Sequence, residues 1–315
     1  MKYAKPLTQT LSTTYDDVEY GFECYQVPKT IKGMNGSIFP KYDKNETYNV
    51  GNYVVIDELK RVFRCTKDNT KGVYPPSDAG IWLDYGFINS YKMFAIDEQI
   101  GDSSVGKDVE IVIEFNRLNT LALLDIDFVK LEVKQTDNDN DDEVLYEETI
   151  SGKNIGATSL AEYMYEEYGY ITRVILDNLV WHPNSTLTLK FESDVSIGTL
   201  VVGNTKELGL TLYGTSLRFE DKSLIENSKV NNTRTVRRYG HIRVLTATVQ
   251  FDTANFNKTA QNIAEIIGKN TLFVPTKNDK YNEMNSIAYI ENFDMPVDNP
   301  EVVSTQITLI GVVKR

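Results

Sequence analysis

The stretch Val109-Glu110-Ile111-Val112-Ile113-Glu114-Phe115 decides the fold class of this chain. Apolar and acidic side chains alternate along nearly its whole length. Because successive side chains of a β-strand point to opposite faces, a period of two is typical of a strand with one buried and one solvated face. We therefore expect a strand here that covers an apolar core on one side.

Period-two patterning of this kind extends over most of the chain. Residues 121–133 alternate in the same way and fit either two strands or one bent strand. Clusters of Gly, Asn and Asp separate the runs, and their spacing favours antiparallel sandwiches over a doubly wound sheet. The further strands that we predict are 171–176, 186–191, 197–202, 208–219, 235–251, 271–275, 287–293 and 302–313.

Two short helices are expected, too few for a nucleotide-binding α/β core. The first begins with the capping box at residues 159–162 and ends near residue 169. The second runs from a cap at Asn255 to Gly268, with four apolar residues at helical spacing: Phe256, Ala260, Ile263 and Ile267. Strands flank this second helix on both sides, so the last hundred residues are predicted to be α+β.

The predicted fold is mainly β, with a small three-stranded module, an antiparallel β-sandwich and a C-terminal α+β segment. Residues 1–45 show no sustained periodicity and are expected to form an N-terminal arm that a partner must order. Residues 46–94 form the small β domain, residues 95–210 the sandwich and residues 211–315 the α+β domain. No internal repeat of fixed period is found.

Composition excludes several classes of protein. The 315 residues carry 33 basic and 45 acidic side chains, a formal net charge of −12, which argues against a nucleic-acid binder with its basic face. No apolar run approaches the roughly 18 residues of a membrane span, and the first 25 residues lack the apolar stretch of a signal peptide. We expect a soluble protein that contacts neither nucleic acid nor membrane and is made in the cytoplasm.

No motif for catalysis stands out. The two histidines, His182 and His241, have no nucleophile motif near them, and each is interpreted as an ordinary turn or strand residue. Cys24 and Cys65 are too few for a disulfide scaffold or a four-ligand zinc site. The sequence therefore predicts neither an enzyme nor a bound cofactor.

An acidic stretch at residues 137–143 offers one weak metal candidate. Asp137, Asp139 and Asp141 alternate as calcium ligands do, and Glu148 stands at the twelfth position. However, Asp142 occupies the sixth position, where the sharp turn of a calcium loop requires Gly. A solvated hairpin tip accounts for the same residues, so we predict no metal site and keep calcium as the alternative.

A basic stretch runs against the overall charge of the chain. Six basic or histidine side chains fall within fifteen residues: Lys229, Arg234, Arg237, Arg238, His241 and Arg243. One interpretation is the polar face of a strand. The other is a contact stripe that docks onto an acidic surface of a neighbouring subunit or copy.

The stretch 46–88 carries a more specific pattern. Tyr48-Asn49-Val50-Gly51-Asn52-Tyr53-Val54-Val55 is followed by Val62-Phe63-Arg64-Cys65, a Gly and Pro loop, and Trp82-Leu83-Asp84-Tyr85-Gly86. This order resembles the small three-stranded chitin-binding type of carbohydrate-binding module. Asn52 and Phe63 depart from the pattern, which has Asp and Tyr at those positions.

Aromatic residues are concentrated in this stretch. Val54, Val62 and Trp82 are predicted to form a small core that needs support from neighbouring segments. The aromatic residues that we predict to contact either a sugar ring or another protein are Tyr53, Phe63, Tyr74, Trp82 and Tyr85.

Two later stretches extend the resemblance. Residues 89–97, Asn-Ser-Tyr-Lys-Met-Phe-Ala-Ile-Asp, are similar to a segment that follows this module in proteins of tailed bacteriophages and prophages. Residues 197–209 and 213–216 are similar to a Gly-rich pattern in the second half of the same proteins. The resemblance implies a virion structural protein of the tail, baseplate or collar, whose partners are copies of itself and other tail or neck proteins.

Two alternatives to a structural subunit remain open. The first is a receptor-binding or adhesion protein that holds host surface glycan through residues 46–88. The second, from the enzyme class, is a depolymerase of a host polysaccharide.

Overall fold

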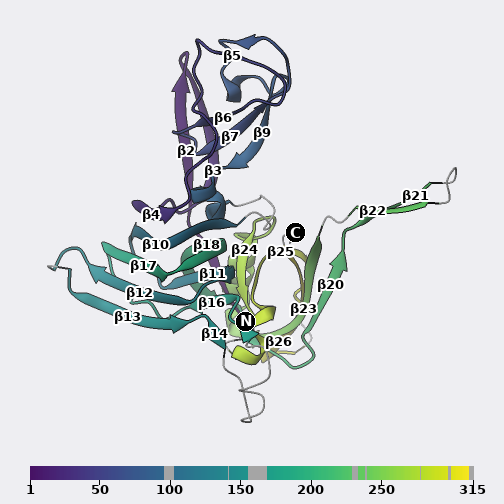
Figure 1. Cartoon of the computed structure of the whole chain (residues 1–315). Coiled ribbons are helices and arrows are strands. Elements are labelled where there is room, and N and C mark those ends of the chain that lie inside the picture. The colour runs from purple at the N-terminus through teal and green to yellow at the C-terminus, as the bar shows by residue number, and fades with distance from the viewer. Residues whose placement is uncertain are drawn as a thin grey trace, which may run out of the picture. The chain divides into compact units, whose positions relative to one another are not determined.

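The computed structural model describes residues 1–95, 103–140, 142–154, 169–228, 233–237, 240–276, 278–296 and 299–311. The chain is mainly β, with 57% strand and 9% helix, and this confirms the predicted fold class. It folds into two compact units (Figure 1). One comprises Leu7–Glu98 and Ser103–Val202, and the other comprises Met1–Pro6, Gln99–Asp102 and Gly203–Arg315. We call them the sandwich unit and the C-terminal unit.

The larger sheet of the sandwich unit is built from long antiparallel strands. Its order is β13 (Val144–Ser151), β12 (Lys130–Asp137), β17 (Ser185–Glu192), β10 (Ser104–Phe115) and, beside β10, β4 (Thr30–Met34). The alternating stretch 109–115 lies in β10, where Ile111 and Ile113 are fully buried while Glu114 is exposed. The alternation therefore does mark a strand with one solvated face.

A smaller group of strands completes the sandwich-like arrangement. β11 (Thr120–Asp127) pairs with β16 (Arg173–Leu176) and with β18 (Asp194–Glu207), which also pairs with β10. The stretch 121–133 is thus two strands, β11 and β12, and not one bent strand. Nearly all of β11 is buried, as expected for a strand covered on both faces.

Residues 1–45 are strands, in contrast to the arm that we expected. β1 (Lys2–Pro6) lies in the C-terminal unit between β18 and β24 (Thr271–Val274), and its Tyr3 and Ala4 are fully buried. β2 (Thr8–Tyr15) and β3 (Val18–Tyr25) form a hairpin in the sandwich unit, while β4 pairs with β10. β1 and β4 pair with strands far along the chain, so the segment shows little apolar periodicity of its own.

The small module forms as predicted. β6 (Tyr53–Ile56), β7 (Arg61–Cys65) and β9 (Trp82–Phe87) make a three-stranded antiparallel sheet with β7 in the centre. The short strands β5 (Thr47–Tyr48) and β8 (Thr70–Lys71) pair beside it, followed by the 3-10 turns η1 (Pro75–Ser77) and η2 (Asn89–Phe94).

The C-terminal unit is a sheet with one helix, which agrees with the α+β prediction. Its strand order is β18, β1, β24, β25 (Ser286–Phe293), β26 (Val302–Gly311) and β23 (His241–Asp252), with β19 (Leu210–Thr211) and β20 (Ser216–Asp221) both beside β23. The 3-10 turns are η3 (Thr253–Asn255) and η4 (Asp279–Met284). Ile263 of α2 (Phe256–Ala264) shares a core with Val249 and Leu309 of the sheet.

Local details of the helices differ from the predictions. Asn255 makes no side-chain cap for α2, whereas Asp252 caps the preceding turn η3 through the backbone N–H of Ala254. Ile267 lies beyond the end of α2 and is exposed. The helix predicted from the capping box at 159–162 falls outside the described residues.

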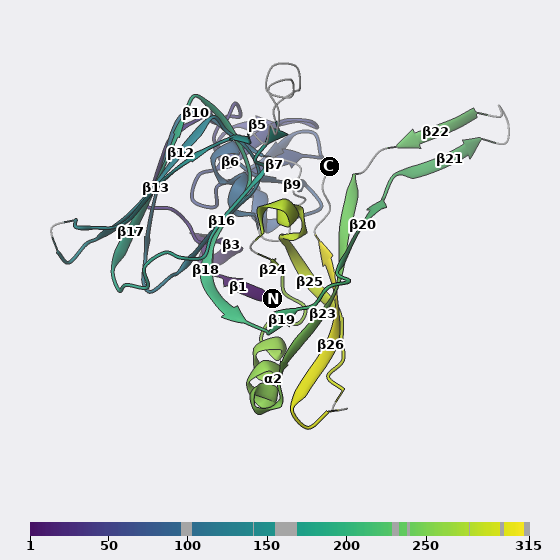
Figure 2. The same cartoon turned by 90° about the horizontal axis from the view of Figure 1, so that it is seen from below.

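Two shorter strand pairings complete the topology. β14 (Lys153–Asn154) pairs with β15 (Gly169–Tyr170). β21 (Leu224–Ser228) and β22 (Thr233–Arg237) form a hairpin that continues from β20 and β23 (Figure 2). Within the described parts of the chain, no helix is long and apolar enough to cross a membrane.

Candidate functional site

Three of the five predicted aromatic contact residues are core residues of the module. Phe63 and Trp82 are each 2% exposed and Tyr74 is 6% exposed. The indole N–H of Trp82 donates to the carbonyl of Val73 at 3.0 Å, which satisfies the only polar atom of that side chain. These three residues therefore stabilise the module and do not present a face for a ligand, which corrects the prediction. Of the predicted core, Val54 packs with them, whereas Val62 is buried outside this cluster.

The hairpin β2–β3 covers the aromatic side of the module. Tyr15 stacks on Tyr74 with ring centroids 4.1 Å apart and planes 3° from parallel. Tyr20 packs against Tyr74 at 5.5 Å, and Phe22 packs against Phe63 at 6.5 Å. The support that the small core needs thus comes from a segment that precedes the module in sequence.

Arg61 joins the hairpin to the module. Its guanidinium lies 4.5 Å from the ring centroid of Phe22 on β3 and 4.4 Å from that of Phe87 on β9. It also donates to both carboxylate oxygens of Asp84, at 3.1 and 2.8 Å. The side chain is only 9% exposed, so the charge is held by a paired carboxylate and two ring faces.

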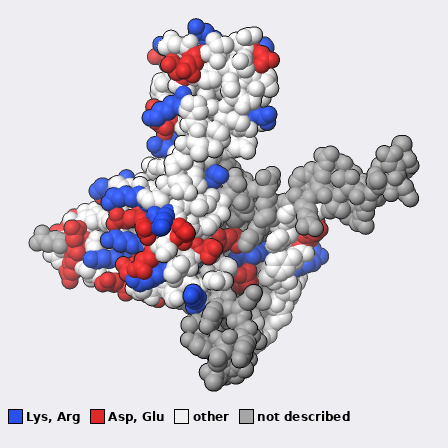
Figure 3. Space-filling view, in the orientation of Figure 1, with Lys and Arg blue, Asp and Glu red and all other residues white. Residues whose placement is uncertain are grey.

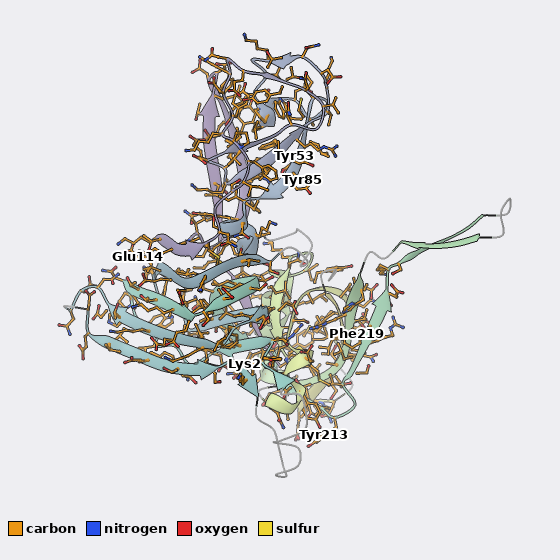
Figure 4. All side chains as sticks on the ribbon, viewed as in Figure 1. Lys2, Tyr53, Tyr85, Glu114, Tyr213 and Phe219 are labelled. Carbon is orange, nitrogen blue, oxygen red and sulfur yellow. The ribbon has the colours of Figure 1, made fainter. Side chains whose placement is uncertain are left out.

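The other two predicted contact residues lie together at the surface. The rings of Tyr53 and Tyr85 meet edge to face with centroids 5.1 Å apart (Figure 4). Phe39 stacks on Tyr53 at 4.8 Å, and the guanidinium of Arg64 lies 5.8 Å from the same ring. Tyr85 is 57% exposed. We call Phe39, Tyr53, Arg64 and Tyr85 the aromatic patch.

The module sheet explains how the aromatic patch forms. Tyr53 on β6 stands opposite Arg64 on the central strand β7. The register of β7 and β9 shifts by one residue next to Tyr85, where Gly86 has a φ of +104°. A bulge of this kind re-aims a side chain, and here it leaves Tyr85 against Tyr53. The patch can stack on a sugar ring or on another protein.

An acidic groove between the hairpin and the module was not predicted. Its volume is about 810 Å³, and its walls include Tyr15, Tyr42 and Tyr74 with several carboxylates: Asp43, Glu46, Asp57 and Glu58. Asp57 forms an ion pair with Lys41. Burial, followed by the neighbouring Tyr15 and Tyr48, raises the pKa of Tyr42 above its usual range. No single stretch of sequence signals this groove, because residues from 13–15, from 41–58 and Tyr74 build it together.

The calcium candidates do not converge on a common point. Asp137 accepts from the backbone N–H of Asp139 at 2.9 Å and lies 3.6 Å from His182. Glu148 belongs to β13 and accepts a hydrogen bond from the hydroxyl of Tyr146, whose pKa is raised to about 12 by burial and by that carboxylate. Asp141 lies outside the described residues. Within the described ranges, no group of three or more His, Cys, Asp or Glu is placed to hold a metal ion.

The predicted basic stripe is divided between different environments. Arg243 lies in β23 with its side chain 11% exposed, 3.0 Å from Glu283 and above the ring of Phe219. It is therefore part of the unit's own packing and not an exposed contact. Arg234 and Arg237 belong to β22, and only their backbone is described. Arg238 falls outside the described residues.

Comparison with known proteins adds no relative. No protein-family model matches this chain, and neither a curated protein nor a solved structure matches it. A function for the chain therefore has to rest on its own residues.

Proposed function

We propose that this chain is a structural subunit of a bacteriophage virion, located in the tail, baseplate or collar and assembled in several copies. The observation that carries the proposal is the burial of Phe63, Tyr74 and Trp82 beneath the chain's own hairpin β2–β3. A module that used these rings to hold sugar would leave them open to solvent. Here they stabilise a protein scaffold.

The order of the sequence blocks supports the same proposal. The module-like stretch 46–88, the segment 89–97 and the Gly-rich stretch 197–216 follow one another as in the tailed-phage proteins that they resemble. In the structure, η2 of the second block is connected to β10, because the side-chain hydroxyl of Ser104 accepts from the backbone N–H of Met93 at 3.0 Å. The module and the sandwich are thereby joined within one unit.

A particle experiment tests the proposal. Tailed particles from a host that produces this chain should contain it after purification through a density gradient, in a fixed ratio to the other tail proteins. Antibodies against the chain should label one position along the tail in electron micrographs. Recovery of the chain only in the soluble fraction, with unlabelled particles, would contradict a structural role.

Glycan binding is the second candidate function, and the aromatic patch is the observation that favours it. The exposed ring of Tyr85, supported edge to face by the half-buried Tyr53, provides a surface on which a sugar ring can stack. If host glycan binds here, Tyr85→Ala should reduce binding by about tenfold, since one stacked ring contributes about 1 kcal/mol or more. A glycan array with purified full chain measures this.

The control for this test is a second exposed tyrosine. Tyr213 lies in a loop of the C-terminal unit and is fully exposed, so Tyr213→Ala removes the same side chain at a distant place in sequence. We expect Tyr213→Ala to leave any sugar binding unchanged. If neither variant nor the natural chain binds any glycan, the patch serves protein contacts only.

A further inference from the structure

The hairpin β21–β22 lacks a partner strand within the described part of the chain. Its two strands pair only with each other, from Leu224 opposite Arg237 to Ser228 opposite Thr233. It is connected to the sheet of its unit through β20 and β23, with one hydrogen bond from the N–H of Lys222 to the carbonyl of Gly240 at 3.0 Å. Because an isolated two-stranded hairpin is marginally stable in water, a further strand would stabilise it.

One strand of this hairpin, β22, is basic. β22 has the sequence Thr-Arg-Thr-Val-Arg, with Arg234 and Arg237 and no acidic residue. Its two Thr and one Val also suit an extended strand. This short positive segment stands out in a chain with a net charge of −12.

A second open edge, in the sandwich unit, is acidic. β13 is the last strand of its sheet and pairs only with β12 within the described residues. Over its eight residues it carries Glu147 and Glu148, and it contains neither Pro nor Gly. A long strand without these interruptions is a template for pairing with another chain.

The surroundings of β13 add to its negative charge. Glu147 stands opposite Lys134 and lines a groove of about 860 Å³ on the solvated face of the sheet. The groove also contains Glu110, Glu114, Glu132 and Asp142, and two of its lysines are already paired with Glu110 and Glu114. Figure 3 shows acidic and basic residues interleaved on the sandwich. Glu132 is also paired, with Lys130, so Glu147 and Asp142 are the groove carboxylates without an ion pair in the described structure, beside a single remaining lysine, Lys134.

The other open edges are less suitable. On β20, Glu220 forms ion pairs with both Arg218 and Lys222, so that edge carries charges that already neutralise one another. β4 has only five residues, and its Gly33 takes a φ of +77°, which interrupts a regular ladder. An edge whose charges are already paired offers less attraction to a basic strand, and an interrupted edge resists pairing.

We propose that β22 of one copy adds as a strand to the β13 edge of a second copy. Main-chain hydrogen bonds would provide the affinity. Arg234 and Arg237 belong to opposite faces of β22, and Glu147 and Glu148 belong to opposite faces of β13, so one arginine and one glutamate would meet on each face and fix the partner and the register. The contact joins two different surfaces of the same chain, so it is heterologous, and repetition generates a ring or a filament. The inference rests on the proposed multi-copy role and names the surfaces that would carry it.

Charge reversal tests the pairing in the full chain. We expect Arg234→Glu with Arg237→Glu to weaken self-association about tenfold or more in analytical ultracentrifugation, and Glu147→Lys with Glu148→Lys to do the same. Equimolar mixing of the two variants should restore association in alternating copies, because β22 of each variant is then opposite in charge to β13 of the other. Combining all four substitutions in one chain should restore association.

A matched control separates this local effect from net charge. Lys44→Glu with Lys67→Glu changes one exposed lysine just before the small module and one within it, and alters the net charge as much as the β22 reversal. Association of this control should equal that of the natural chain. The proposal would be overturned if the control variant lost as much self-association as the β22 reversal, or if the β22 reversal lost none.

A cysteine pair tests the geometry independently of charge. Thr235→Cys in β22 and Thr149→Cys in β13 are placed in separate copies with different tags, while the native Cys24 and Cys65 stay buried. Mild oxidation should yield a disulfide between the two tagged chains. Absence of that product, or a disulfide formed only when both cysteines share one chain, contradicts the proposal.

These outcomes are distinguishable from failure of the proposed function. If the natural chain is found in particles but the reversal variants associate normally, only the strand-addition inference is wrong. If the chain self-associates through β22 and β13 but is absent from particles, the virion role is wrong and the pairing stands.

Discussion

Replacing Trp82 with alanine is expected to reduce the free energy of unfolding of the module by about 3–5 kcal/mol, the range for removing a large aromatic side chain from a core. The ring is 2% exposed and meets Tyr48 at 5.3 Å and Tyr42 at 6.2 Å, both edge on. The substitution also leaves the carbonyl of Val73 without its N–H donor. Hydrogen exchange of the amides in β6, β7 and β9 measures the loss within the full chain.

Leu83→Ala provides the control for Trp82. Leu83 is the next residue of β9 and is 51% exposed, so its truncation should change the same exchange rates by about 0.5 kcal/mol or less. Trp82→Phe keeps most of the apolar volume, so its effect on the exchange rates should lie between those of Trp82→Ala and Leu83→Ala. If Trp82→Ala left the exchange rates unchanged and instead abolished sugar binding, Trp82 would be a ligand contact and the proposed structural role of the module would fall.

The β-rich fold was predictable because the long strands carry their own pattern. β10, β17, β23 and β26 each alternate buried and more exposed residues, as a strand at the surface of a core must. Boundaries were less accurate where the partner strand, and not the local sequence, ends the element. The predicted strand 208–219 is in fact β19 and β20, both held by the single long strand β23.

The N-terminal segment could not be predicted from its own composition. β2 and β3 contain mostly Thr, Ser, Tyr and Glu, and no residue of β2 is buried. The hairpin is ordered by contacts such as that of Phe22 with Phe63, more than forty residues away. A local pattern cannot show a contact of that kind, because the stabilising surface lies elsewhere in the chain.

The separation of the aromatic residues into core and surface was only partly predictable. Val54 and Phe63 are direct neighbours across β6 and β7 and share the buried face, while Tyr53 and Arg64 share the other. This assignment of side chains to the two faces of β6 and β7 follows from the period of two. The register shift beside Tyr85 breaks the period of two in β9, so alternation from Trp82 gives no guide to that residue. The hairpin that covers Tyr74 then decides which rings remain free.

Arg61→Ala is expected to destabilise the same region by about 3 kcal/mol, because it removes one partner of a largely buried ion pair. The loss has two sources: the packing between Phe22 and Phe87, and the two hydrogen bonds to Asp84. Arg61→Lys keeps the charge but cannot form the planar contact with both rings, so it should recover less than half of the loss. Chemical denaturation of the full chain, monitored by aromatic near-ultraviolet circular dichroism, measures both variants.

A double-mutant cycle with Asp84 separates these two sources. Arg61→Ala and Asp84→Ala, alone and together, should show a coupling energy of about 1–3 kcal/mol, the range for residues in direct contact. Arg64→Ala on the same strand is the control, since Arg64 is exposed and should couple weakly to Asp84. A coupling energy near zero would show that the ring contacts alone hold Arg61. In that case Arg61→Met, which retains an apolar stem between Phe22 and Phe87, should be nearly as stable as the natural chain. A strong coupling predicts instead that Arg61→Met is destabilised, because Asp84 loses its partner.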